Sequence, residues 1–262
     1  MDLGIAGKVA LVTGASRGLG RAVAAALLRE GVRVMITARN AERLAETRAA
    51  LEKETQGEVG AAAADLERDG EVKAMVDATV RRFGGIDILV NNAATVMPAD
   101  FLVLSDEAWL HVFEEKTNGY VRCLRHAVPV MKGRGWGRII NVSGLAGRQP
   151  KSTTITVGVN NAAVLNLTKS LSLLLAADNI LVNAVLPYII DTETQDETMA
   201  RVARLTGKSE ADVRKERTAH ITVGRMGRPE EVADVIAFLA SAKSSYVTGA
   251  GWHVDGGAYG GI

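Results

Sequence analysis

Cysteine is nearly absent from this chain of 262 residues. Cys123 is the only cysteine, which excludes an intrachain disulfide and a structural zinc site built from thiolates. It falls in a helix-like pattern, where a buried and unreactive thiol is a better interpretation than a nucleophile. We predict no metal site.

Excess charge and long apolar runs are also missing. The formal net charge is +1, so electrostatics indicates neither a nucleic-acid nor a membrane partner. The most apolar region, residues 171–190, is interrupted by Asp178, Asn179 and Asn183 and cannot span a bilayer. The N-terminus lacks the basic-then-apolar pattern of a signal peptide. We expect a soluble cytoplasmic protein.

No repeat, linker or low-complexity segment divides the chain, and its length suits one α/β domain, residues 1–262. Strand-like and helix-like segments alternate throughout, which predicts a doubly wound, Rossmann-type sheet of about seven parallel strands flanked by helices. The expected strands are 9–12, 33–37, 59–64, 86–90, 138–142, 180–185 and 252–254. The expected helices are 21–28, 41–54, 71–82, 106–131, 162–177, 192–220 and 229–240.

A glycine-rich turn separates the first strand from the first helix. Gly14, Gly18 and Gly20 are spaced Gly-x-x-x-Gly-x-Gly between the apolar run 9–12 and an Ala/Leu-rich helix. Backbone N–H groups at such a turn, together with the helix dipole, favour a phosphate anion, and the missing Cβ atoms let a pyrophosphate come close. Three glycines alone also fit a plain turn, but the flanking strand and helix favour a nucleotide site.

Polar residues follow the third and fourth strands. Asp65 comes after strand 59–64, and Asn91, Asn92 and Ala93 come after strand 86–90. Each fits a helix cap or turn residue by itself. Ligands of parallel sheets bind at the carboxyl ends of the strands, so these residues and the glycine turn together predict one binding edge.

With the glycine turn, these motifs make the chain similar to the short-chain dehydrogenase/reductase family over nearly its whole length. Further matches are Val182-Asn183-Ala184-Val185-x-Pro187 with Thr192, Arg225-x-Gly227-x-Pro229, and Thr248-Gly249 followed by Val254-Asp255-Gly256-Gly257. The resemblance implies that Asp65 hydrogen-bonds the adenine, that Asn91 lies beside the adenosine ribose and that the Thr192 hydroxyl meets the nicotinamide carboxamide. The complete predicted cofactor set is Gly14, Ser16, Arg17, Gly18, Leu19, Gly20, Arg39, Asp65, Leu66, Asn91, Ala93, Asn161, Pro187 and Thr192.

The cofactor predicted for this site is NADP(H). An NAD site needs an acidic residue at the end of the second strand to accept from the ribose 2′-OH, and Ala38 stands there. Arg39 and Arg17 are placed to bind a 2′-phosphate instead, which guanidinium groups suit well. The alternative is a pair of solvated surface arginines.

The resemblance also implies a catalytic Ser, Tyr, Lys and Asn, and all four of these positions are replaced. In the register of Trp109, Gly137 and the run Asn161-Ala162-Ala163-Val164-Leu165, the asparagine position is Lys116 and the serine position is Gly144. The tyrosine position is Val157, and the lysine position is Asn161. Valine exchanges no proton, and Asn161 has no charge to lower a phenol pKa.

Three other residues are candidates for the missing proton donor: Lys116, Tyr188 and Ser143. Lys116 is a cation gained on a helix, Tyr188 follows Pro187 where the family has glycine, and Ser143 precedes the serine position. Their alternatives are a solvent-facing lysine, a packed tyrosine and a serine at a strand end. Residues 190–225 are expected to form a polar lid over the substrate.

Three functions fit these residues. The first is an NADP-dependent oxidoreductase with a non-standard site, acting on an imine or conjugated alkene in preference to a simple ketone. The second is an inactive nucleotide-binding subunit that pairs with an active homologue. The third is a lyase or isomerase that uses Lys116 or Tyr188. The resemblance further implies a homodimer or homotetramer and a small-molecule substrate.

Overall fold

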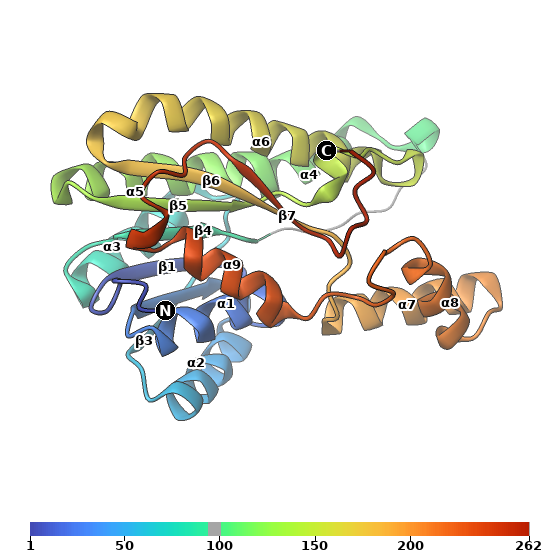
Figure 1. The fold of residues 1–262 in the computed structure, drawn as a ribbon, viewed down its shortest axis with the longest axis horizontal. Coiled ribbons are helices and arrows are strands. Elements are labelled where there is room, and N and C mark those ends of the chain that lie inside the picture. The colour runs from blue at the N-terminus through green and yellow to red at the C-terminus, as the bar shows by residue number, and fades with distance from the viewer. Residues whose placement is uncertain (94–100, 262) are drawn as a thin grey trace.

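The fold is that of a computed structural model, which describes residues 1–93 and 101–261. The predicted domain also includes residues 94–100 and 262, which lie outside the described part. Seven parallel strands form one sheet in the order β3-β2-β1-β4-β5-β6-β7 (Figure 1), which confirms the predicted doubly wound fold. The strands are β1 (Val9–Thr13), β2 (Arg33–Ala38), β3 (Val59–Ala63), β4 (Ile88–Asn91), β5 (Gly137–Val142), β6 (Ile180–Pro187) and β7 (Gly251–Val254).

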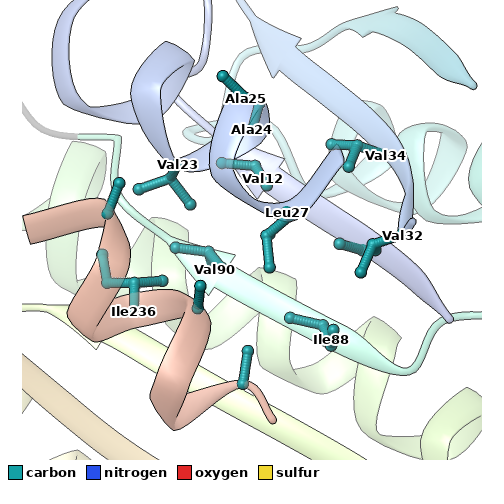
Figure 2. Packing of buried hydrophobic residues seen from close by; sticks show 14 of the residues in the cluster. Val12, Val23, Ala24, Ala25, Leu27, Val32, Val34, Ile88, Val90 and Ile236 are labelled. Carbon is teal, nitrogen blue, oxygen red and sulfur yellow. The ribbon is translucent and has the colours of Figure 1, made fainter. Parts of the chain in front are cut away.

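Helices cover both faces of this sheet. One layer contains α1 (Gly18–Arg29), α2 (Ala41–Thr55) and α9 (Pro229–Leu239), and the other contains α3 (Asp69–Phe83), α5 (Gly119–Arg134) and α6 (Ile155–Leu175). In β1 the side chains of Ala10 and Val12 pack on the first layer, and those of Val9 and Leu11 pack on the second. This alternation buries the whole strand, because successive side chains point to opposite faces. In Figure 2, side chains of β1, β2 and β4 meet those of α1 and α9.

The predicted helix 106–131 contains a break. It consists of α4 (Asp106–Phe113), a π-helical turn η2 (Glu114–Asn118) and α5. The predicted cap is present, since the Ser105 side chain accepts from the Ala108 N–H at 3.3 Å. A π turn inserts one extra residue per turn and is common at functional sites, and Lys116 lies within this one.

The predicted segment 192–220 forms two helices, α7 (Glu193–Thr206) and α8 (Glu210–Thr218). They lie to one side of the sheet (Figure 1). A small apolar cluster of their own, which includes Met199, Val213 and Ile221, packs with Leu145 and Ile189 from the ends of β5 and β6. The pair is therefore anchored at the carboxyl edge of the sheet, where the site residues gather.

Candidate functional site

The glycine turn is packed against the end of β4. A Cβ added to Gly20 would lie 2.3 Å from the Gly14 carbonyl oxygen, and one added to Gly14 would lie 2.8 Å from the Ala93 Cα. The Thr13 hydroxyl accepts from the Asn92 N–H at 2.9 Å and from the Ala93 N–H at 3.1 Å. Neither glycine position has room for a side chain, so the observed shape of the turn requires glycine at both.

A cavity of about 580 Å³ opens over this turn. Most of the predicted cofactor residues line it: Gly14, Ser16, Arg17, Gly18, Leu19, Gly20, Arg39, Asp65, Leu66, Ala93 and Thr192. Tyr188 lines it as well, so the structure brings one of the three candidate proton donors together with the cofactor residues. Asn91, Asn161, Pro187, Lys116 and Ser143 are buried outside its lining.

Asn91 is completely buried. Its Nδ2 donates to Asn141 Oδ1 at 2.9 Å, and Asn141 Nδ2 donates to the Thr168 hydroxyl at 3.0 Å. This chain of hydrogen bonds joins β4, β5 and α6. Asn92 and Ala93, rather than Asn91, reach the cavity.

Arginines gather at one end of the cavity. Arg17 forms a 2.6 Å ion pair with Glu197 of α7, and Arg39 forms a 3.2 Å ion pair with Glu115 of η2. Arg43 also lines the cavity, although it is not among the predicted cofactor residues. The available signal was Asn40, whose side chain caps α2 by accepting from the Arg43 N–H at 2.8 Å and so places Arg43 in the first turn beside Arg39.

The pair between Arg17 and Glu197 connects the glycine turn to the helices 193–218. The Arg17 guanidinium lowers the pKa of the Glu197 carboxyl below its ordinary value. Both side chains are partly exposed, so the pair contributes little stability. A phosphate that binds Arg17 would therefore displace Glu197 at little cost in free energy.

Three of the four positions predicted to replace the catalytic tetrad, Lys116, Gly144 and Asn161, lie together with Ser143. Lys116 Nζ donates to Asn161 Oδ1 at 2.6 Å and to the Ser143 carbonyl oxygen at 2.8 Å, and the Ser143 hydroxyl donates to the Asn161 carbonyl at 2.9 Å. Gly144 has φ +104°, and a Cβ there would lie 2.8 Å from Asn161 Nδ2. The Asn161 amide therefore occupies the space that a side chain at position 144 would need.

Burial governs the charge of Lys116. Lys116 is only 8% exposed, and burial lowers the pKa of its amine to about 7. A neutral amine keeps two N–H donors, which matches the two hydrogen bonds that Lys116 makes. Lys116 is thus a buried donor that holds the turn 143–144 and α6 together, and it does not face the cavity.

Replacing Lys116 by methionine tests this burial. Between about pH 7 and about pH 10, the free energy of unfolding of the wild type should rise relative to that of K116M, by up to about 1.4 kcal/mol per pH unit. The free energy of unfolding rises with pH because a lysine in the unfolded chain keeps its proton up to about pH 10.4, whereas folded Lys116 loses it at about pH 7. Urea denaturation at several pH values measures the difference. Lys243→Met, which removes an exposed lysine, is the control, and identical pH dependence of wild type and K116M would contradict the assignment.

The Tyr188 hydroxyl contacts two residues that are not among the predicted site residues. Lys151 Nζ donates to the Tyr188 hydroxyl at 2.6 Å, and the Tyr188 hydroxyl also contacts His220 Nε2. Sequence spacing gives no signal for this group, since Lys151 and His220 are 37 and 32 residues away from Tyr188. Only the fold brings them together.

The described residues 1–93 and 101–261 contain no group of His, Cys, Asp and Glu that could hold a metal ion. Among the same residues, no helix is long and apolar enough to cross a membrane. Cys123 is buried, as predicted, and burial raises the pKa of its thiol to about 12.

Comparison with known proteins identifies the family to which this chain belongs. The sequence profile of the family described as enoyl-(acyl carrier protein) reductase matches residues 14–259. The chain belongs to the short-chain dehydrogenase/reductase family. Its residues match the 3-oxoacyl-[acyl-carrier-protein] reductase of Aquifex aeolicus with 33% identity, over 99% of this chain and 100% of that protein.

Two solved structures of reductases show the same fold. L-sorbose reductase from Gluconobacter frateurii, complexed with NADPH and L-sorbose, has a TM-score of 0.96 and 33% identity over 100% of both chains. A variant of actinorhodin polyketide ketoreductase with NADPH has a TM-score of 0.92 and 34% identity, covering 96% of this chain and 97% of that one. Both hold NADPH, the cofactor predicted from Ala38, Arg17 and Arg39.

Proposed function

We propose that this chain is an NADP(H)-dependent oxidoreductase that transfers a hydride to or from a small-molecule substrate. The observation that carries the proposal is that Arg17, Arg39, the glycine turn, Thr192 and Tyr188 all line one cavity. It has a cationic end for a phosphate, a glycine turn at a helix N-terminus for a pyrophosphate, and a polar end for a nicotinamide.

The residues present fit NADP(H) better than NAD(H). Ala38 offers no acceptor to a ribose 2′-OH, and Arg17, Arg39 and Arg43 line the place where a 2′-phosphate would lie. The NADPH held by two structural relatives supports this choice. Asp65 would hold the adenine at the same edge, and the Thr192 hydroxyl would hold the carboxamide.

We further propose that Lys116, Gly144, Val157 and Asn161 occupy the four tetrad positions. Their arrangement supports this interpretation, since Asn161 fills the space beside Gly144 and takes a hydrogen bond from Lys116. None of the four is placed to protonate a substrate in the cavity. The tyrosine acid of the tetrad is therefore missing. We propose an imine or conjugated alkene as the substrate in preference to a simple ketone, because an imine nitrogen is more basic than a ketone oxygen and accepts its proton from a weaker acid.

When bound, the reduced nicotinamide supplies the hydride. The chain itself binds and orients: the glycine turn and arginines hold the phosphates, and the helices 193–218 limit the access of water. Lys116 keeps Ser143 and Asn161 in place behind the site.

A lyase or isomerase reaction through Lys116 has less support, because that amine is buried and already donates two hydrogen bonds. An inactive subunit that pairs with a homologue has no specific observation in its favour. The homodimeric or homotetrameric state and the cytoplasmic location stay predictions.

The experiment is a binding and turnover comparison on the purified full chain. We expect NADPH to bind more tightly than NADH, and its absorbance to decay with cyclic imines or conjugated enones faster than with matched ketones. Tighter binding of NADH would contradict the cofactor assignment. Bound NADPH that is oxidised by no member of the panel would favour the inactive subunit.

A further inference from the structure

Three polar side chains from distant segments meet at the nicotinamide end of the cavity. Lys151 precedes the short helix 152–154 after β5, Tyr188 directly follows β6, and His220 follows α8. We call Lys151, Tyr188 and His220 the Tyr188 cluster. Of the three, Tyr188 lines the cavity, while Lys151 and His220 are exposed.

The Tyr188 hydroxyl is at the centre of the cluster. Lys151 Nζ lies 2.6 Å from the hydroxyl oxygen and 3.4 Å from His220 Nε2, and it also sits 4.9 Å from the centroid of the Tyr188 ring. The rings of Tyr188 and His220 meet edge to face at 5.3 Å and 67°. Their contact joins the hydroxyl to Nε2.

The direction of these hydrogen bonds follows from the chemistry of the groups. Lys151 can only donate, so the tyrosine oxygen accepts from it, and the tyrosine O–H is left to donate to His220 Nε2. Burial lowers the pKa of His220, and the charges of Lys151 and Arg217 lower it further. A neutral imidazole with Nε2 as its acceptor is the form that this arrangement requires.

The cluster is held by packing as well as by hydrogen bonds. Tyr188 packs on the apolar cluster of Met199, Val213 and Ile221, and Ile221 is the residue next to His220. Packing of this kind holds a proton donor at a defined place. It also couples the position of His220 to the helices 193–218.

We propose that Tyr188 is the catalytic residue that exchanges a proton with the substrate, with Lys151 and His220 as its positioning and relay residues. This rests on the proposed function. In reduction of an imine, the substrate carbon accepts a hydride from a reduced nicotinamide cofactor. The C=N π pair moves to nitrogen, and Tyr188 gives its O–H proton to that nitrogen, which leaves an amine and a tyrosinate.

Lys151 and His220 complete the step. The Lys151 ammonium lies 2.6 Å from the Tyr188 oxygen, where it pairs with the negative charge that remains on this oxygen after the proton has left. Neutral His220, which is exposed to solvent, takes up a proton from water at Nε2 and passes it to the tyrosinate, which restores the Tyr188 hydroxyl. In oxidation the same groups carry the proton outward, from substrate to Tyr188 to His220 to water.

Substitution of Tyr188 by phenylalanine tests the catalytic role. We expect kcat with the best member of the imine and enone panel to fall by about 10² to 10⁴, with the dissociation constant of NADPH unchanged. Tyr246→Phe is the matched control, because Tyr246 is fully exposed, and it should behave as wild type. Lys151→Arg should keep more activity than Lys151→Met, since it retains the charge.

A second measurement needs no cofactor. The chain has 4 histidines, so the His220 imidazole can be assigned by NMR with His220→Gln and then titrated. Lys151→Met should raise the pKa of His220, because it removes a charge that lowers it, and Tyr188→Phe should shift the Nε2 resonance.

The outcomes separate the two proposals. Wild-type kcat in Tyr188→Phe overturns the role of the Tyr188 cluster and leaves the proposed function intact. So does a His220 imidazole whose pKa is unchanged by Lys151→Met and whose Nε2 resonance is unchanged by Tyr188→Phe. Wild-type protein that binds no NADPH, or binds it and oxidises it with no substrate of the panel, overturns both. Loss of kcat together with the two NMR changes supports both.

Discussion

Substitution of Gly20 by alanine should abolish NADPH binding, with the dissociation constant raised by at least about 100-fold. The added Cβ would lie 2.3 Å from the Gly14 carbonyl oxygen, and both atoms belong to the turn that would hold the pyrophosphate. Because neither is the end of a flexible side chain, the backbone of the turn has to move. Its N–H groups then no longer point at one place, and an anion site depends on that convergence.

Gly70→Ala is the matched control, because a Cβ on Gly70 at the start of α3 meets no atom within 4 Å. Binding is measured by the fluorescence of NADPH, and circular dichroism with thermal unfolding shows whether each variant is folded. A folded G20A protein that binds NADPH as tightly as wild type would show that the turn is not the cofactor site.

Removing Arg17 and Arg39 together should weaken NADPH binding by about 100-fold and change NADH binding by less than about threefold. A hydrogen bond to a charged group contributes about 1.5–3 kcal/mol, and about 1.4 kcal/mol corresponds to a factor of ten. Each arginine is partly exposed and already paired with a carboxylate, so we expect about tenfold from each.

The ratio of the two affinities is the decisive quantity, measured by isothermal titration of R17A/R39A with NADPH and NADH. Arg48→Ala serves as the control, because Arg48 lies on α2, pairs with Glu52 at 3.8 Å and does not line the cavity. Equal losses of affinity for NADPH and NADH would mean that the two arginines maintain the shape of the turn and do not bind the 2′-phosphate.

The order of strands and helices could be predicted because the strands at the centre of the sheet are buried on both faces. In β1 and β4 every residue is buried, which leaves short apolar runs that end at polar residues. Those ends are where the binding edge is, so Asp65 and Ala93 could be placed beside the glycine turn from the sequence. The NADP(H) prediction followed from a missing acid at Ala38 and two arginines nearby.

The boundaries of α6 and of the π turn could not be predicted in the same way. α6 begins at Ile155, seven residues before the expected start, although Thr156, Val157 and Gly158 are poor helix formers. Contacts with the turn 145–147 stabilise this first part, and tertiary contacts of that kind leave no local pattern. The π turn continues the helical periodicity of its neighbours, so only the backbone hydrogen bonds reveal it.

The surroundings of the candidate proton donors were also beyond the sequence. Lys116 had the chemistry of a replacement cation, but its two acceptors, Ser143 and Asn161, come from other segments and direct its amine away from the cavity. Tyr188 gained Lys151 and His220 as partners for the same reason. Hydrogen bonds between distant segments follow from the fold, and a sequence pattern does not contain them.

A crystal structure of the full chain with NADPH tests most directly the claim that this binding edge serves hydride transfer. We predict a fully ordered cofactor, with its 2′-phosphate on Arg17 and Arg39 and its nicotinamide between Thr192 and Tyr188. An ordered adenosine with a disordered nicotinamide, or a 2′-phosphate that contacts neither arginine, would contradict it.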